Sequence, residues 1–203
     1  DGANKRGSSL FPDILENKLY PSKSFDIQVT TVRETFGNVY FKVWDTLTSG
    51  TMPVTVGGDH SVAIPSIFAS NAYCKLIRKK LGVLWLDAHA DFNTIETSPT
   101  KNLHGVPVSV LCGHTLSSLM YGNALETKQF AYYGLRDLDS LEFERFQEHN
   151  MHVLNSYTEL KKWTEKYDKI HISFDVDCLD PSVMPSVNTP VKNGLDLKTV
   201  SNI

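Results

Sequence analysis

Short apolar runs alternate with longer segments of mixed polarity along the chain of 203 residues. The short runs are rich in β-branched and aromatic residues, and they predict strands at Asp26–Val32, Met52–Val56, Gly82–Leu86, Phe130–Tyr133, His152–Leu154 and Ile170–Phe174. The longer segments predict helices at Asn38–Leu47, Ile64–Lys80, Leu138–His149 and Thr158–Lys166. Because several runs are apolar enough for strands covered on both faces, the alternation predicts βαβ units built on a parallel sheet.

Composition, charge and cysteine content exclude some classes of protein. The chain is 41% hydrophobic and carries 20 Lys and Arg against 23 Asp and Glu, which is typical of one soluble domain over residues 1–203. It lacks the cationic block and the long apolar run that binding to nucleic acid or insertion into a membrane requires, so we expect neither partner. Three widely spaced cysteines without a CxxC motif predict no disulfide framework and no thiolate metal site, and they favour a cytoplasmic protein.

The densest groups of Asp and His directly follow three of the predicted strands. They are Gly57-Gly58-Asp59-His60-Ser61, Asp87-Ala88-His89-Ala90-Asp91 and Asp175-Val176-Asp177-Cys178. In an open α/β sheet, ligands bind outside the carboxyl ends of the strands, so we expect these segments to converge. Alternate residues of an extended segment point to the same side, which places Asp87, His89 and Asp91 together.

Six side chains of these segments form a candidate metal centre: His60, Asp87, His89, Asp91, Asp175 and Asp177. Carboxylates and imidazoles without a thiolate favour Mn²⁺ over structural zinc. The four carboxylates would be balanced by two divalent cations, so we expect two Mn²⁺ per subunit, which lower the pKa of a shared water and favour hydrolysis. In the alternative interpretation, the Asp residues are helix caps or surface charges, and the histidines are packed polar groups.

These motifs resemble those of the ureohydrolase family, which comprises arginases, agmatinases and formiminoglutamases. Its three hallmark segments correspond to Gly57–Ser61, Asp87–Asp91 and Ser173–Pro181, in the same order. The segments Asp91–Thr94 and Asn102–Pro107 resemble arginases more than agmatinases. The resemblance runs from about residue 53 to residue 194 and implies a three-layer α/β/α fold with a mostly parallel central sheet.

The resemblance also implies an activity. The protein would be a binuclear manganese hydrolase that cleaves the guanidinium group of L-arginine to L-ornithine and urea, by attack of a metal-bridging hydroxide. One Mn²⁺ would be bound by His60, Asp87, Asp91 and Asp175, and the other by Asp87, His89, Asp175 and Asp177. Asp91 would also contact the hydroxide or the leaving amine. His104 would exchange a proton with solvent, a role that suits imidazole because it titrates near neutral pH.

Four further residues are implied at the substrate. Asn93 would bind the substrate carboxylate, Asp139 the α-ammonium group, and Thr189 would lie near the guanidinium end. Thr100 stands where arginases usually have a serine and keeps the hydroxyl group, although Lys101 replaces the usual glycine. The resemblance further implies a homotrimer or another homo-oligomer.

Family members are longer than this chain. We therefore expect the chain to lack the first strand of the family and a C-terminal portion whose glutamate pairs with the substrate guanidinium. Two alternatives keep the metal centre: an agmatinase or other guanidino-hydrolase, and a non-catalytic metal-binding homologue. Asn93 and Asp139 favour an α-amino acid substrate, because they would have little to bind on a decarboxylated one.

Overall fold

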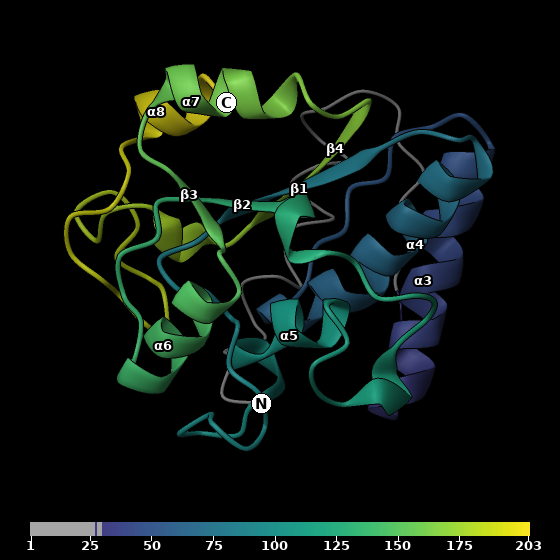
Figure 1. The fold of residues 1–203 in the computed structure, drawn as a ribbon, viewed down its shortest axis with the longest axis horizontal. Helices are drawn as coiled ribbons and strands as arrows, with labels where there is room; N and C mark the ends of the chain where they lie inside the picture. The colour runs from purple at the N-terminus through teal and green to yellow at the C-terminus, as the bar shows by residue number, and fades with distance from the viewer. Residues whose placement is uncertain (1–26, 28–29) are drawn as a thin grey trace.

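The computed structural model describes residue 27 and residues 30–203, and its centre is a four-stranded parallel sheet (Figure 1). The strands are β1 (Leu81–Leu86), β2 (Phe130–Tyr133), β3 (His152–Leu154) and β4 (Lys169–Phe174), in the order β3-β2-β1-β4. Leu86 pairs with Tyr133 on one side and with Phe174 on the other. The carboxyl ends of β1, β2 and β4 therefore lie at the same edge of the sheet.

Helices cover both faces of this sheet, so the structure confirms the predicted three-layer α/β/α class (Figure 1). The helices are α3 (Val32–Thr48), α4 (Ala63–Leu76), α5 (Pro107–Leu111) and α6 (Ser140–Glu148) on one side, and α7 (Tyr157–Thr164) and α8 (Leu197–Ser201) on the other. Among the residues described, no helix is long and apolar enough to cross a membrane.

The alternation of side chains along the strands divides the core into two layers. Trp85 of β1 is fully buried and packs in the same cluster as Phe68 of α4. Its neighbour Leu84 points to the opposite face, where it packs with Trp163 of α7. Burial of each such side chain contributes about 1.5–3 kcal/mol, so the strand ends are held by apolar contacts on both sides.

Side-chain caps begin the helices that follow the strands. The Asp139 carboxylate accepts a hydrogen bond from the Glu142 N–H at the start of α6 (2.9 Å), and Ser156 accepts one from the Glu159 N–H at the start of α7 (3.2 Å). Such caps stabilise a helix end by about 1 kcal/mol. They make each helix begin at a defined residue after its strand.

Several predicted elements differ from the structure, and the helix predicted at Asn38–Leu47 begins six residues earlier, because Thr31 caps α3 before Val32. Met52–Val56 is not a strand, and the Met52 side chain is 81% exposed, because this apolar segment has no pairing partner among the described strands. Helix α4 ends at Leu76 instead of Lys80, because Arg78 adopts a left-handed conformation with φ 57°. Of the strand predicted at Asp26–Val32, residues 26, 28 and 29 lie outside the described residues, and the described ones do not form a strand, because Thr31 caps α3 and Val32 is its first residue.

Candidate metal centre

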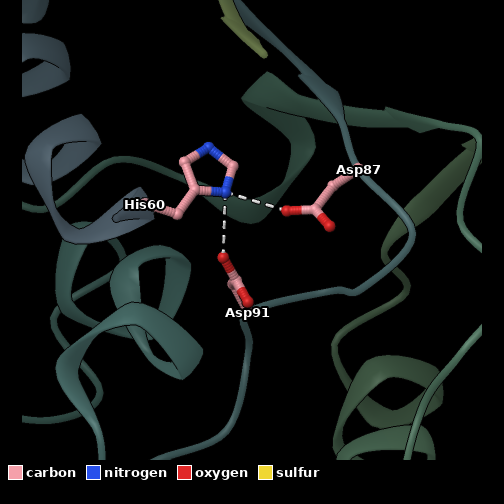
Figure 2. A group of neighbouring side chains, drawn as sticks. All are labelled: His60, Asp87 and Asp91. Carbon is pink, nitrogen blue, oxygen red and sulfur yellow. Dashed lines mark hydrogen bonds and ion pairs between the residues drawn. The ribbon is translucent and has the colours of Figure 1, made fainter. Parts of the chain in front are cut away.

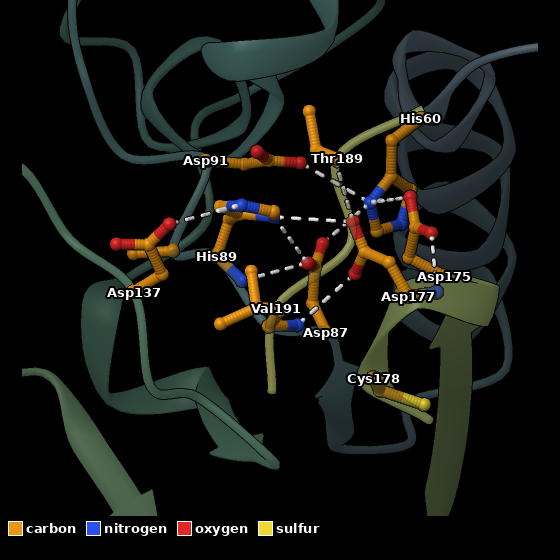
Figure 3. Close-up of polar contacts among 12 residues, drawn as sticks. His60, Asp87, His89, Asp91, Asp137, Asp175, Asp177, Cys178, Thr189 and Val191 are labelled. Carbon is orange, nitrogen blue, oxygen red and sulfur yellow. Dashed lines mark hydrogen bonds and ion pairs between the residues drawn. The ribbon is translucent and has the colours of Figure 1, made fainter. Parts of the chain in front are cut away.

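The candidate centre lies where the loops after β1 and β4 meet the turn before α4 (Figure 3). Asp87 directly follows β1 and is 1% exposed, and Asp175 directly follows β4. The Asp175 N–H donates to the Leu86 carbonyl at 2.8 Å, which continues the pairing of the two strands beyond their ends. His60 begins the short 3₁₀ turn that leads into α4. All six side chains predicted as metal ligands are brought together at this edge of the sheet (Figure 3).

His60, Asp87 and Asp91 form the first cluster (Figure 2). His60 Nδ1 lies 2.8 Å from Asp87 Oδ2, 3.1 Å from Asp91 Oδ2 and 3.5 Å from Asp175 Oδ2. One ring nitrogen carries at most one proton, so it cannot donate to three carboxylates. Asp91 Oδ2 is accordingly buried without a hydrogen bond to any of the described residues. Carboxylates that crowd around one nitrogen, one of them lacking a donor, fit a centre that a cation completes.

Asp87, His89 and Asp177 form the second cluster. His89 Nδ1 lies 3.3 Å from Asp87 Oδ1 and 3.2 Å from Asp177 Oδ2. Asp87 therefore belongs to both clusters and faces each with a different oxygen, Oδ2 toward His60 and Oδ1 toward His89. A carboxylate in this position can bridge two cations.

Trp85 and Ser173 fix the orientation of the His60 ring. The Trp85 indole stacks on it and also donates its Nε1–H to Asp87 Oδ2 at 3.1 Å. Ser173 Oγ lies 2.8 Å from His60 Nε2, which leaves Nδ1 to face the carboxylates. The sequence analysis assigned no role to Trp85 at the site. Its only signal was its position on β1, two residues before Asp87.

Burial and mutual charge shift the pKa values of the centre strongly. Burial lowers the pKa of His60, but the nearby carboxylates of Asp87 and Asp91 outweigh it and raise that pKa well above its ordinary value. Burial also opposes the charge on His89, yet its hydrogen bonds to Asp177 and Asp87 raise its pKa to about 11. Burial and the charge of Asp87 raise the pKa of Asp91 far above the usual range and that of Asp175 to about 6. Protons therefore occupy this centre when no cation does.

The donor set is made of oxygen and imidazole nitrogen. Such ligands suit a hard or borderline divalent cation. Cys178 lies next to Asp177 in the sequence and is buried, and burial raises the pKa of its thiol to about 12. The thiol therefore stays protonated at neutral pH and does not offer a thiolate ligand. Cys74, Cys112 and Cys178 are all free and buried.

Three of the four residues predicted at the substrate lie in contact with other site residues. Asn93 Nδ2 donates to Asp139 Oδ2 at 2.7 Å, so the two groups expected at the amino-acid end of the substrate are paired. Thr189 Oγ1 donates to Asp177 Oδ2 at 3.1 Å, which places it at the second cluster. Thr100 differs, because it is exposed and its Oγ1 accepts a hydrogen bond from the Asn102 N–H of its own loop at 3.3 Å.

His104 and Asp137 lie at the margin of the centre. His104 is part of the 3₁₀ turn Leu103–Gly105, which packs against the turn that carries His60. Its imidazole is partly exposed to solvent. Asp137 Oδ2 lies 3.6 Å from His89 Nε2 (Figure 3), a relationship that sequence reasoning did not predict. Its signal was the short acidic run after β2, in which only Asp139 was singled out.

Comparison with known proteins identifies the class of protein. The model of the Arginase family matches residues 11–203. The chain therefore belongs to the Arginase family, which agrees with the resemblance found in its motifs.

Curated relatives and solved structures agree with this assignment. An arginase of Neurospora crassa is 40% identical to this chain, and the match covers 73% of this chain and 47% of that protein. An arginase of Coccidioides posadasii is 37% identical, and the match covers 77% of this chain and 55% of that protein. The chain thus spans about half the length of these relatives. The crystal structure of arginase from Bacillus subtilis subsp. subtilis str. 168 has a TM-score of 0.78 and 29% identity, and covers 95% of this chain and 73% of its own. Entamoeba histolytica arginase, solved in complex with L-ornithine, has a TM-score of 0.77 and 26% identity. The match covers 97% of this chain and 78% of that structure.

Proposed function

We propose that the protein is a binuclear manganese hydrolase that cleaves the guanidinium group of L-arginine to L-ornithine and urea. The observation that carries this proposal is the buried Asp87 carboxylate, which faces one histidine and carboxylate cluster with each of its two oxygens. The name arginase, which the curated relatives carry, supports arginine as the substrate.

The two clusters would each hold one Mn²⁺, with Asp87 and Asp175 shared between them. Two divalent cations supply Lewis acidity that lowers the pKa of water and stabilises the negative charge that develops during hydrolysis. The choice of manganese is supported by the number of carboxylates, which are harder ligands than the thiolates of structural zinc sites. The buried Asp91 Oδ2, which accepts no hydrogen bond within the described part of the chain, supports a cation at the first cluster.

Asp91 and His104 would handle protons. Asp91 Oδ2 lies inside the first cluster, 3.1 Å from His60 Nδ1, and the Asp91 carboxylate would accept a hydrogen bond or a proton during hydrolysis. His104 is partly exposed on a turn that packs against the turn of His60. An imidazole in that position can pass a proton between the centre and bulk solvent.

The amino-acid end of the substrate would be bound by the Asn93 and Asp139 pair and by the Thr100 hydroxyl. Asn93 Nδ2 is a hydrogen-bond donor, which suits the substrate carboxylate, and the Asp139 carboxylate suits the α-ammonium group. Thr189, which donates to Asp177, would lie near the guanidinium end. This arrangement favours L-arginine over agmatine, because agmatine has no carboxylate for Asn93. We further propose a homotrimer in the cytoplasm, a location that the free, buried cysteines support.

Urea release tests this function. The protein is loaded with Mn²⁺ and offered L-arginine or agmatine at mildly alkaline pH, with a chelator-treated sample as the control. We expect urea from L-arginine, little from agmatine, and none after chelation. Release from agmatine alone would support an agmatinase, and two bound ions without turnover of any guanidine would support a non-catalytic metal-binding homologue. Size-exclusion chromatography with light scattering measures the number of subunits.

A further inference from the structure

We infer that two side chains outside both clusters, Glu142 and Arg136, each set the cation affinity of one cluster by fixing the backbone that carries its ligands. Glu142 acts on the first cluster through the backbone after Asp91. Arg136 acts on the second cluster through the backbone carbonyl of Asp177. This inference rests on the proposed binuclear function and assigns a separate positioning residue to each of its two cation sites.

Glu142 holds the peptide that follows Asp91. It lies on α6, is 5% exposed, and its Oε1 accepts a hydrogen bond from the Phe92 N–H at 2.8 Å. Asp91 itself has φ 50°, a left-handed conformation that is uncommon for residues with a side chain, although Asp adopts it more readily than most. The Val108 N–H, which donates to the Asp91 carbonyl at 3.0 Å, and the Glu142 carboxylate hold this turn from both sides.

Arg145 holds the next peptide, between Phe92 and Asn93, from the following turn of α6. Its Nε donates to the Phe92 carbonyl at 3.3 Å, so both polar groups of Phe92 are bound by side chains of one helix. Asp139, at the start of this helix, binds Asn93. Because α6 is packed on the sheet through Phe146, the segment that carries Asp91 is tied to the core of the domain.

Arg136 holds the turn that carries Asp177. Its guanidinium nitrogens donate at 2.8–3.4 Å to the backbone carbonyls of Gly134, Asp177, Cys178, Leu179, Val191 and Lys192. The ion pairs within the described ranges do not include Arg136, so its N–H groups serve the backbone. A planar fork with five N–H groups reaches these six carbonyls with one N–H of Nη2 shared between two of them, whereas a lysine ammonium has only three N–H groups.

The Asp177 carboxylate depends on that fixed backbone. Its Oδ1 accepts a hydrogen bond from the Ala88 N–H at 3.2 Å, and its own N–H donates to Asp175 Oδ1 at 3.0 Å. Arg136 Nη2 binds the carbonyl of the same residue at 2.8 Å. Releasing the carbonyl would let the turn after β4 shift and move Asp177 away from His89, while the peptide after Asp91 would keep its anchor on α6.

Variants that lack the histidine of one cluster separate the effect of Glu142 from the effect of Arg136. In His89→Ala only the first cluster retains its histidine, and in His60→Ala only the second one does. We expect Glu142→Gln to weaken Mn²⁺ binding about tenfold in the His89→Ala background and to leave it nearly unchanged in His60→Ala. The carboxylate accepts from the backbone N–H groups of both Phe92 and Asn93, and glutamine has only one acceptor oxygen for the two. Arg136→Lys should give the opposite pattern. Isothermal titration of cation-free protein with MnCl₂ measures each affinity.

Control variants distinguish positioning from general damage, and circular dichroism checks that each variant is folded. Glu144→Gln makes the same change at an exposed position of α6, and Arg33→Lys makes the matching change at an exposed arginine, so neither should alter Mn²⁺ affinity. Equal weakening of both clusters by one variant, or no weakening at all, would overturn the inference alone. If the unmodified protein bound fewer than two ions, the proposed function would fail, and this inference with it.

Discussion

The indole of Trp85 stacks on the imidazole of His60, with ring centroids 4.1 Å apart and an angle of 22° between the planes. The same indole donates a hydrogen bond to Asp87 Oδ2. A fully buried residue of the central strand thus orients two members of the first cluster. The candidate metal centre is therefore an extension of the apolar core, and its geometry depends on how that core is packed.

Replacing this indole should weaken cation binding. Trp85→Phe keeps an aromatic ring but removes the N–H that binds Asp87, so we expect the Mn²⁺ affinity of the first cluster to fall several-fold and stability to fall by about 1–3 kcal/mol. Titration calorimetry and urea unfolding measure the two effects. Trp163→Phe is the control, because Trp163 is equally buried on the opposite face of the sheet. If Trp85→Phe lowered stability but left the Mn²⁺ affinity unchanged, the indole would serve packing alone.

His104→Ala should separate proton transfer from metal binding. We expect two bound ions as in the unmodified protein and a kcat reduced about 10²–10⁴-fold, because a general acid or base contributes an effect of that size. Added imidazole should restore part of the rate. His152→Ala, at an exposed position of β3, is the control for loss of a histidine. Loss of metal from His104→Ala, measured by atomic emission, would contradict the assigned role.

Mn²⁺ binding should release protons and strengthen as pH rises. Without a cation the pKa of His89 is raised to about 11 and that of Asp175 to about 6, so His89 is protonated at neutral pH. A cation binds the neutral imidazole and the ionised carboxylate, so it must displace the proton. Calorimetry in two buffers of different ionisation enthalpy counts the protons, and we expect at least one per protein. An affinity that did not change between about pH 6 and pH 8 would be the contrary result.

Asn93→Ala should change substrate affinity more than turnover. The variant loses the donor proposed for the substrate carboxylate, which is worth about tenfold to a hundredfold in KM when the partner is charged. Initial rates over a range of L-arginine concentrations separate KM from kcat. We expect the metal content to stay at two ions, since Asn93 contacts Asp139 and Thr97 and is not part of either cluster. A fall in kcat with unchanged KM would place the substrate carboxylate elsewhere.

The sequence predicted that these side chains converge because parallel strands end at one edge. Asp87 and Asp175 directly follow paired strands, so their convergence needed only the strand positions and the direction of the sheet. The same reasoning failed for Met52–Val56, because an apolar run becomes a strand only when another strand pairs with it, and local pattern does not specify that partner. Thr100 shows a related limit: its motif position did not predict that it would be exposed in its own loop.

The residues that orient the centre were harder to predict. Trp85 has the pattern of an ordinary core residue, and its contact with His60 joins positions far apart in the chain. Glu142 and Arg136 act through backbone groups of distant loops, and their residue types give no sign of this. Such long-range hydrogen bonds become visible only when the packing of α6 and the turn after β4 is known.

Anomalous diffraction from crystals grown with MnCl₂ tests the central claim most directly. Two manganese peaks are expected, one on each side of the Asp87 carboxylate, the first beside His60 and Asp91 and the second beside His89 and Asp177. A map without such peaks, or with a single ion that Asp87 does not contact, would contradict a centre in which this carboxylate joins two metal sites.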